Sequence, residues 1–440
     1  MDGEAVLKRV LIISYYWPPS GGIAVLRCLK FAKYLRQYGW EPVVFTARNA
    51  HYPTIDHSND VDIPAGIEII RHPIWEPYGW YKKFLGKPPE ENVNNVFYTS
   101  EEDGGWKHRL AVWVRSNFFI PDARAFWIRG AVSRLLDYLQ RHPVDAILSD
   151  GPPHSNTRIA TLVSRQTGLP WLADFQDPWT QVDYYQLLHL TRWGRRRHER
   201  MEAEAFAQAS LTTIVSPSWK AKLEEIGARN VRVLYWGYDP EDFAGIERVP
   251  HKKFTLSHLG IMGYDRKPEV LFAAIQQLNQ GEEGFASAFE LRLYGQVDHR
   301  VRQQIEAYGL LEQTRFMGAV SRAEALQQTV NSHVLLLLLN QQENAAGRIP
   351  GKLFEYLAAR RPMLNFGPAD SDVARIIEGV GAGRTFAYTA APALPAQTLR
   401  EWYRNYRRGD EISQDSGAID QYSHPELVKK LASWLDTLTT

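Results

Sequence analysis

Short apolar runs alternate along this chain with segments in which apolar residues recur every three to four positions. The first run, at 10–13, ends a predicted strand over residues 8–13. A loop with two prolines and two glycines follows at 14–22, and residues 23–38 show helical spacing. A second run at 42–46 completes a strand–helix–strand unit. Strands that alternate with helices in this order form parallel sheets, so the pattern predicts an α/β fold.

The alternation continues to about residue 240 and then begins a second time. We predict one doubly wound, Rossmann-like domain over residues 1–240, another over residues 250–415, and a helix at 425–440 that crosses back to the first domain. The segment 237–250, which contains proline, glycine and aspartate, is the expected linker. Further strands are expected at 146–148, 171–173, 211–215 and 231–234, and then at 254–259, 291–294, 314–316, 334–339 and 362–365.

Residues 52–131 interrupt this rhythm and are predicted to be an insertion in the first domain. Between residues 106 and 129, six aromatic side chains are interleaved with five lysines and arginines, and Arg195 to Arg197 form a second basic group. Aromatic and basic residues together suit the surface of an anionic membrane, and they equally suit a core helix with solvated cations. Both interpretations stay open at this point.

Composition narrows the class of protein. Hydrophobic residues make up 44% and charged residues 23%, which excludes extended disorder. The net charge of +1 provides no general attraction to nucleic acid, so we expect no nucleic-acid partner. Cys28 is the single cysteine, which excludes disulfides within the chain and cysteine-based zinc sites.

The expected location is the cytoplasm, with the inner face of the membrane as the place of any membrane contact. Residues 1–9 lack the pattern of a signal peptide. The longest apolar run, Val334 to Leu339, is far shorter than the roughly 20 residues that span a bilayer. It has the length of a buried strand.

Three loops that follow strands of the first domain carry candidate chemistry. Gly21 and Gly22 allow a ligand to approach the backbone at the start of a helix, although a tight turn explains them equally well. His154 follows the next strand, where it either donates to a substrate or is a surface histidine. Asp174 and Asp177 follow another strand together with Trp179, whose ring could stack on a sugar, and two carboxylates beside a tryptophan favour a functional site over a solvated loop.

Two loops of the second domain combine flexible backbone with positive charge. Gly260 is followed by Arg266 and Lys267, an arrangement that suits a diphosphate, with solvated cations as the alternative. After the apolar strand 334–339, a second loop carries Arg348 and opens a helix that contains Lys352 and Glu355. Lys352 could contact a phosphate while Glu355 accepts hydrogen bonds from ribose hydroxyls, and an exposed Lys–Glu pair is the simpler explanation.

In combination these motifs resemble the family 4 retaining glycosyltransferases of the GT-B fold, especially bacterial members of polysaccharide and glycoconjugate pathways. The similar segments are 15–22, 152–155, 174–179 and 214–218. The resemblance implies two Rossmann-like domains facing a central cleft, with the nucleotide sugar in the second and the acceptor mainly in the first. It implies that Gly260, Arg266 and Lys267 contact the diphosphate, that Lys352 assists them and that Glu355 holds the ribose. Together with the loops described above, we expect Gly21, Gly22, Glu343 and Arg348 also to bind the donor, Trp17 and Trp179 to bind the acceptor, and His154, Asp174 and Asp177 to be catalytic.

The chain departs from the family pattern at two positions. Family members usually have a glutamate eight residues before the one at Glu355, but this chain has Gly347 there, and Glu343 in the same loop is the candidate replacement. The histidine that usually follows the strand ending at Ala173 is also absent, and Asp174 and Asp177 occupy that region.

The predicted function is therefore a retaining hexosyltransferase of bacterial glycoconjugate biosynthesis. It would move a sugar from a nucleotide-diphosphate sugar to a hydroxyl of a glycan, a lipid-linked acceptor or a small molecule. Cations and backbone amides would stabilise the leaving diphosphate, so we expect no essential metal and no cofactor besides the co-substrate. A nucleotide-sugar epimerase of the same fold and a catalytically silent sugar-binding scaffold are the alternatives.

Overall fold

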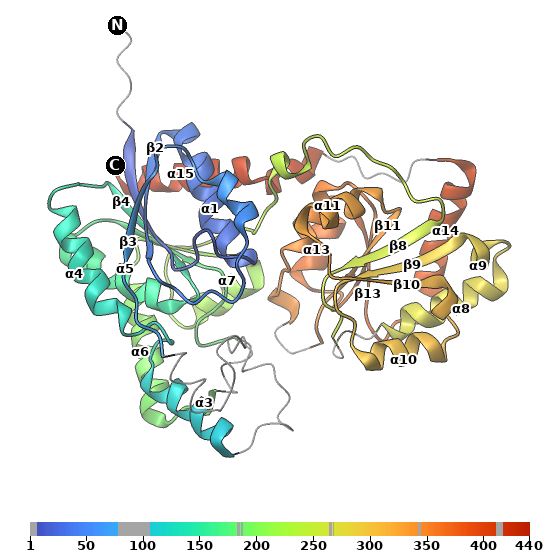
Figure 1. Cartoon of the computed structure of the whole chain (residues 1–440), viewed down its shortest axis with the longest axis horizontal. Helices are drawn as coiled ribbons and strands as arrows, with labels where there is room; N and C mark the ends of the chain where they lie inside the picture. The colour runs from blue at the N-terminus through green and yellow to red at the C-terminus, as the bar shows by residue number, and fades with distance from the viewer. Residues whose placement is uncertain are drawn as a thin grey trace, which may run out of the picture. The chain divides into compact units, whose positions relative to one another are not determined.

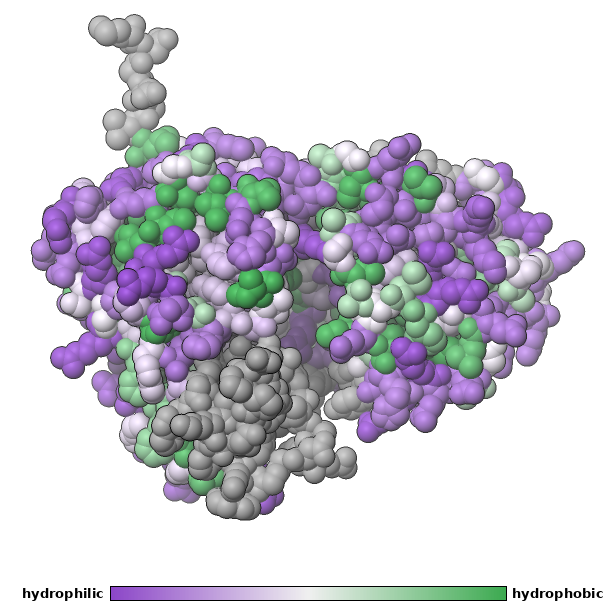
Figure 2. All heavy atoms as spheres, viewed as in Figure 1, coloured by the Kyte–Doolittle hydropathy of each residue, from purple (hydrophilic) through white to green (hydrophobic). Residues whose placement is uncertain are grey.

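The computed structural model describes residues 7–77, 106–182, 185, 188–263, 266, 268–341, 345–410 and 417–440. The chain divides into two compact units (Figure 1). Unit 1 comprises Met1–Tyr235 and His424–Thr440, and unit 2 comprises Trp236–Ser423. On the face drawn in Figure 2, hydrophilic residues cover most of the described surface of each unit, as expected for folds whose apolar residues fill an interior.

Unit 1 is built on a parallel sheet of seven strands in the order β3-β2-β1-β4-β5-β6-β7. Its strands are β1 (Lys8–Ile13), β2 (Trp40–Ala47), β3 (Glu68–His72), β4 (Ala146–Gly151), β5 (Trp171–Phe175), β6 (Leu211–Ile214) and β7 (Val231–Val233). Its helices are α1 (Ile23–Leu35), α3 (Trp106–Phe118), α4 (Trp127–Leu139), α5 (His154–Thr167), α6 (Arg192–Gln208), α7 (Pro217–Glu225) and α15 (His424–Leu438).

Both faces of this sheet are buried, which explains why its strands read as continuous apolar runs. Val10 and Ile12 of β1 belong to a core shared with α1 and α15. Leu11 and Ile13 point to the opposite face and are also 0% exposed. The last helix, α15, therefore completes the core of unit 1, although it comes at the end of the chain.

The segment 52–131 holds more regular structure than its sequence suggested. It contains strand β3, the short 3-10 helix His57–Asp62, helix α3 and the first residues of α4, while residues 78–105 lie outside the described residues. β3 was missed because it has only five residues and its sequence, EIIRH, has no clear alternation. It pairs with β2 at the edge of the sheet, so much of this segment belongs to the domain itself.

Unit 2 is built on a parallel sheet of six strands in the order β10-β9-β8-β11-β12-β13. Its strands are β8 (Phe254–Leu259), β9 (Phe289–Tyr294), β10 (Thr314–Gly318), β11 (Val334–Leu338), β12 (Met363–Phe366) and β13 (Gly383–Phe386). Its helices are α8 (Glu269–Gly281), α9 (Phe285–Ala288), α10 (His299–Ala307), α11 (Arg322–Asn331), α12 (Lys352–Ala358), α13 (Asp372–Gly379) and α14 (Ala393–Arg408). The prediction of two Rossmann-like α/β domains is confirmed.

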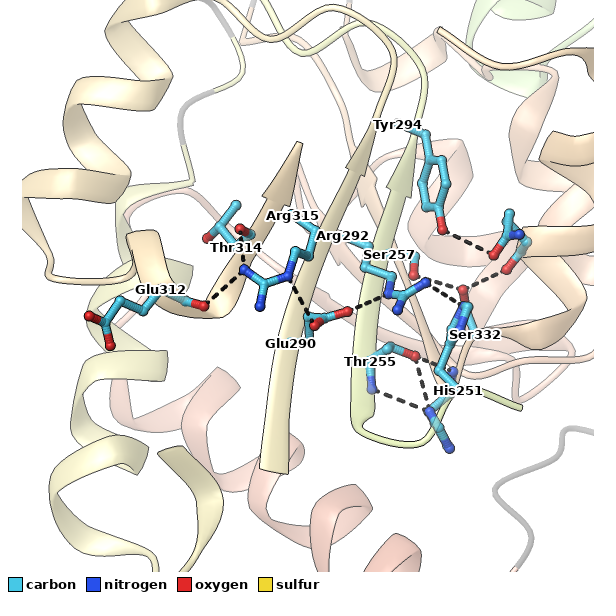
Figure 3. A network of polar contacts seen from close by, with 12 residues as sticks. His251, Thr255, Ser257, Glu290, Arg292, Tyr294, Glu312, Thr314, Arg315 and Ser332 are labelled. Carbon is cyan, nitrogen blue, oxygen red and sulfur yellow. Dashed lines mark hydrogen bonds and ion pairs between the residues drawn. The ribbon is translucent and has the colours of Figure 1, made fainter. Parts of the chain in front are cut away.

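One face of β8, β9 and β10 carries a network of polar contacts. Figure 3 shows Glu290 between the guanidinium groups of Arg292 and Arg315, at nitrogen–oxygen distances of 2.6 and 3.4 Å. On the same face, the hydroxyl of Ser332 donates to Ser257 Oγ over 2.7 Å. Alternate residues point the other way and enter the apolar core, namely Leu256, Leu291 and Leu293. The network ties three strands together and is distinct from the loops at their carboxyl ends.

Candidate functional site

The sheet of unit 2 has a topological switch point between its neighbouring strands β8 and β11. The chain leaves β8 toward β9 on one side and leaves β11 toward β12 on the other. Ligands of open parallel sheets bind at such a point, outside the carboxyl ends of the strands. Two of the predicted site loops begin here, one after Leu259 and the other after Leu338.

Gly260 and Lys352 meet at this switch point. Gly260 has a φ of +129°, a conformation that side chains disfavour, and a Cβ atom there would collide with Nζ of Lys352. The amide of Gly260 donates to the carbonyl of Tyr294 over 2.9 Å. The absent side chain therefore leaves room for the ammonium group to lie against the loop backbone, which is a suitable arrangement for a phosphate.

Lys352 lies in an environment that disfavours its charge. Burial, and then the neighbouring Arg266, lower its pKa to about 8, while Glu355 acts in the opposite direction. Arg266 Nη1 donates to the carbonyl of Ile261 over 3.4 Å, in the same loop as Gly260. An anion placed between these two cations would be attracted by both, and it would relieve their mutual repulsion.

The buried histidine below this loop is neutral. Burial lowers the pKa of His258 to about 3, and the charge of Lys352 contributes in the same direction. His258 Nδ1 lies 2.9 Å from the carbonyl oxygen of Leu336, to which it can only donate. The histidine thus links β8 to β11 directly behind the loop.

The other predicted donor residues of unit 2 have different placements. The carboxylate of Glu355 receives a hydrogen bond from Arg322 over 2.9 Å and is 30% exposed. Arg348 is partly buried and lies directly after the short 3-10 helix Ala345–Gly347. Lys267 and Glu343 lie outside the described residues.

Unit 1 has its own switch point, between β1 and β4, and a buried carboxyl group lies there. Asp150 Oδ2 accepts a hydrogen bond from the hydroxyl of Ser14 over 2.9 Å, and Oδ1 accepts one from Asn156 over 2.6 Å. Burial raises the pKa of Asp150 to about 7 despite these hydrogen bonds. The sequence analysis did not single out Asp150, because its role depends on contacts between separate strands.

Asp174, predicted to be catalytic, is buried in an ion pair. Its two oxygens accept hydrogen bonds from Nε and Nη2 of Arg27 over 2.5 and 2.8 Å, and Thr213 donates to it over 2.6 Å. Both charged side chains are 0% exposed. With its hydrogen bonds directed inward, Asp174 joins α1, β5 and β6, and direct action on a substrate would require breaking this ion pair.

The rings of His154 and Trp179 stack on each other, with centroids 4.3 Å apart and an interplanar angle of 1°. Burial, followed by the effect of His198, lowers the pKa of His154 to about 3 and keeps it neutral. Trp179 is 3% exposed and Trp17 is 0% exposed. Each tryptophan would have to be uncovered before it could contact an acceptor, whereas Asp177 is partly exposed.

The predicted glycine loop of unit 1 is attached to a neighbouring segment. The amide of Gly21 donates to the carbonyl of Thr54 over 2.8 Å, so it is already occupied. Gly22 precedes α1 with a φ of +87°, and it is exposed. Gly21 is partly exposed and Gly22 is exposed, but the amide of Gly21 could bind a ligand only by giving up its hydrogen bond.

Two segments of the chain have the Asp-x-Asp spacing that binds a metal–diphosphate complex in another transferase fold. In the first, Asp60 to Asp62, the second aspartate is bound by Lys30 and Lys33 over 2.6 and 2.7 Å. In the second, Asp372 is 1% exposed and pairs with Arg375 over 2.7 Å. In both segments the described contacts neutralise one of the two carboxylates with a cationic side chain.

The fold and the family comparison together define the class of this protein. Residues 21–238 match the family model of the glycosyl transferase 4-like domain. The solved structures that resemble the whole chain are of the GT-B type, with two Rossmann-like domains. The chain therefore contains a glycosyl transferase 4-like domain and has the GT-B fold, and these two findings together support a glycosyltransferase.

Three solved structures illustrate the similarity. A glycosyltransferase from Rickettsia africae has a TM-score of 0.60 at 13% identity, over 98% of each chain. Anabaena HepE, solved in complex with UDP, has a TM-score of 0.54 at 13% identity, over 98% of this chain and 97% of that one. An alpha,alpha-trehalose-phosphate synthase (UDP-forming) from Burkholderia vietnamiensis has a TM-score of 0.58 at 12% identity, over 98% and 99%. At these identities the likeness shows the fold, and no curated protein sequence matches the chain.

Proposed function

We propose that this protein transfers a hexose, with retention, from a nucleotide-diphosphate sugar to a hydroxyl of a glycan, a lipid-linked acceptor or a small molecule in bacterial glycoconjugate biosynthesis. The observation that carries the proposal is the contact between Gly260 and Lys352 at the switch point of unit 2. A uridine nucleotide is the first donor to test, because HepE was solved with UDP.

The chemistry that this site supports is departure of a diphosphate. The bond between the sugar carbon and the diphosphate oxygen breaks, and its electron pair leaves with the diphosphate. The acceptor oxygen bonds to that carbon and loses its proton, which the oxygen of the departing diphosphate can accept. Lys352 and Arg266 would stabilise the charge on the leaving group, which is why the proposal includes no essential metal and no cofactor.

On the acceptor side, Asp177 and His154 remain our candidates for contact with the reacting groups. Asp177 is partly exposed and lies two residues after the end of β5. The neutral His154 could accept or donate a hydrogen bond without the cost of a buried charge. We propose that Asp174, held by Arg27, positions the loop that contains Asp177.

Two alternatives compete with this proposal. An epimerase of the same fold would also bind a nucleotide sugar, so nucleotide binding alone does not separate the two. The match to a glycosyl transferase 4-like domain favours transfer. A silent scaffold would bind sugar without turnover, and the intact set of Gly260, Lys352 and Glu355 argues against it.

The first experiment is a thermal-shift screen of the whole chain against UDP, GDP, dTDP, ADP and CMP. One nucleotide should raise the melting temperature of the wild type and not that of Lys352→Ala. Lys253→Ala, which removes an exposed lysine of the same unit, is the matched control and should respond as the wild type does. Release of the selected diphosphate from its sugar nucleotide, with an acceptor-dependent rate, would then show transfer. If no nucleotide stabilised the wild type at millimolar concentration, the proposal would be wrong.

We also propose peripheral contact with an anionic membrane, at the inner face of the cytoplasmic membrane. Leu110, Trp113, Val114 and Phe118 follow one face of α3 at spacings of three and four, and each is at least 37% exposed. Asn117 lies within this face, four residues after Trp113, but it is only 2% exposed, because its side-chain oxygen accepts a hydrogen bond from the amide of Thr191, directly before α6.

The start of α6 contributes charge beside that apolar stripe. Trp193 is 56% exposed, and the guanidinium of Arg197 lies 5.2 Å from its ring centroid. Arg192, Arg195 and Arg196 are exposed on the same helix. Exposed tryptophans with clustered arginines are typical of a surface that binds anionic lipid headgroups. Among the described residues, no helix has the length and apolar character needed to cross a bilayer.

Sedimentation with lipid vesicles tests this contact. The wild type should bind vesicles that contain phosphatidylglycerol, bind vesicles of phosphatidylcholine alone more weakly, and lose binding as salt is added. The double variant Trp113→Ser, Phe118→Ser should stay in solution. Leu311→Ser is the matched control, because it removes an exposed apolar residue of unit 2. Equal sedimentation of wild type and double variant would refute membrane contact through α3.

A further inference from the structure

One arginine of unit 2 holds the carboxylate that was predicted to bind ribose. Arg322 is the first residue of α11, and Nη1 donates to Glu355 Oε1 over 2.9 Å. Its Nη2 donates to Oδ2 of Asp242, also over 2.9 Å. Asp242 lies in the 3-10 helix Pro240–Phe243, close to the start of unit 2. A single planar guanidinium thus bridges two carboxylates from separate elements.

This bridge lies close to a competing cation. Lys352 and Glu355 are three residues apart on α12, a spacing at which opposite charges attract each other across one helical turn. The negative charge of Glu355 acts to raise the pKa of Lys352. If Glu355 formed an ion pair with Lys352, the ammonium would be less available to bind a diphosphate. The carboxylate would likewise be less available to accept hydrogen bonds from the ribose. Arg322 holds Glu355 from the other side and so opposes that pairing.

The contact with Arg322 leaves Glu355 able to bind a ligand. Only Oε1 receives a hydrogen bond from Arg322, and the side chain of Glu355 is 30% exposed. Among the described residues, no hydrogen-bond or ion-pair partner is found for Oε2. A carboxylate fixed through one oxygen can accept hydrogen bonds from sugar hydroxyls through the other.

We propose that Arg322 is a positioning residue of the donor site, which holds Glu355 away from Lys352 so that the carboxylate meets the ribose hydroxyls and the ammonium meets the diphosphate. This inference rests on the proposed function. The guanidinium suits the task because its fork can hold two carboxylates in one plane, which a lysine ammonium does not do. Asp242 contributes by fixing the far side of the fork.

The test compares UDP with 2′,3′-dideoxy-UDP by calorimetric titration of the whole protein. The wild type should bind UDP about tenfold more tightly, since the charge-assisted hydrogen bonds of the ribose are absent from the analogue. Glu355→Gln and Arg322→Met should each reduce that ratio toward one, and Arg322→Lys should give an intermediate ratio. Arg404→Met is the matched control, because Arg404 forms an exposed pair with Glu282 in the same unit.

Two further measurements separate positioning from a merely structural role. The preference for UDP over 2′,3′-dideoxy-UDP should fall no further in the double variant Arg322→Met, Glu355→Gln than in Glu355→Gln alone, because Arg322 acts through Glu355. In Arg322→Met, UDP affinity should also begin to fall at a higher pH than in the wild type. The charged groups that act on Lys352 are Arg266 and Glu355, with His258 neutral, and the released Glu355 would stabilise the ammonium.

The outcomes distinguish this inference from the proposed function. The role of Arg322 would be refuted if Arg322→Met kept the wild-type preference for UDP over the dideoxy analogue while Glu355→Gln removed it. That result would still support the donor site. Additive losses in the double variant would also refute it. If the wild type bound neither UDP nor the other nucleoside diphosphates of the screen, the proposed function would fail and the inference would fail with it.

Discussion

Nucleotide binding should depend on pH through Lys352. Its pKa is lowered to about 8 by burial and by Arg266, against the opposing effect of Glu355. A diphosphate beside the ammonium favours the charged form, so binding takes up a proton wherever the free protein has lost one. Affinity is therefore fully present below about pH 7 and falls above about pH 8. At about pH 9 roughly nine-tenths of the free lysine is deprotonated, which weakens binding about tenfold, or by about 1.4 kcal/mol.

Calorimetry of the whole chain with UDP, at several pH values between about pH 7 and about pH 9, measures this effect. Buffers of different ionisation enthalpy count the protons taken up on binding. Lys352→Arg is the matched variant, because a guanidinium stays charged throughout this range. The ratio of the two affinities cancels any ionisation of the nucleotide itself, so the tenfold change should appear in that ratio.

Two results would refute the reasoning about Lys352. One is an affinity ratio between wild type and Lys352→Arg that stays constant with pH. The other is binding without proton uptake by the wild type at about pH 8.5, where a lysine with this pKa is mostly deprotonated. Either result would mean that the diphosphate binds away from the ammonium.

Three other substitutions have definite expected effects. Gly260→Ala should weaken UDP binding about tenfold, because its Cβ would strain the backbone and displace the lysine ammonium, whereas Gly309→Ala, also at positive φ but in open space, should not. Asp174→Asn should lower the free energy of unfolding, measured in urea, by about 3 kcal/mol, since it leaves Arg27 buried without its counter-charge. If the unpaired charge is the cause, the double variant Asp174→Asn, Arg27→Met should lose less stability than Asp174→Asn alone. Asp150→Asn should change how stability varies with pH. The raised pKa makes the folded wild type bind the proton more tightly than the unfolded chain does, so the free energy of unfolding should fall from about pH 4 to about pH 7 and then level off. Asp150→Asn should lack this fall. Parallel stability curves for the two proteins would contradict the raised pKa of Asp150.

Most of the fold could be predicted from local pattern. The continuous apolar runs at 10–13 and 334–339 lie in central strands that are buried on both faces, because a parallel sheet covered by helices has no solvated side. The loops expected to bind ligands do follow strands. The last helix, predicted at 425–440, is found at His424–Leu438 in unit 1.

The candidate site could be predicted only in part. Gly260 and Lys352 were chosen from separate loops, and the structure brings them into contact. For Trp17 and Trp179, an aromatic residue beside a strand end looked available for stacking, but the structure buries both. Sequence position does not reveal exposure at a loop, since exposure depends on which distant segments cover that loop.

The sequence by itself determined the alternation of strands and helices, the division into two domains and the resemblance to a glycosyltransferase family. Only the tertiary structure decided the partners of the charged residues. Arg27 meets Asp174 across 147 positions, and Arg322 meets Glu355 across 33. Periodicity reports which face of an element is buried, and it carries that information locally. Which charges meet depends on strand order and helix packing, because these bring together residues that no local pattern connects.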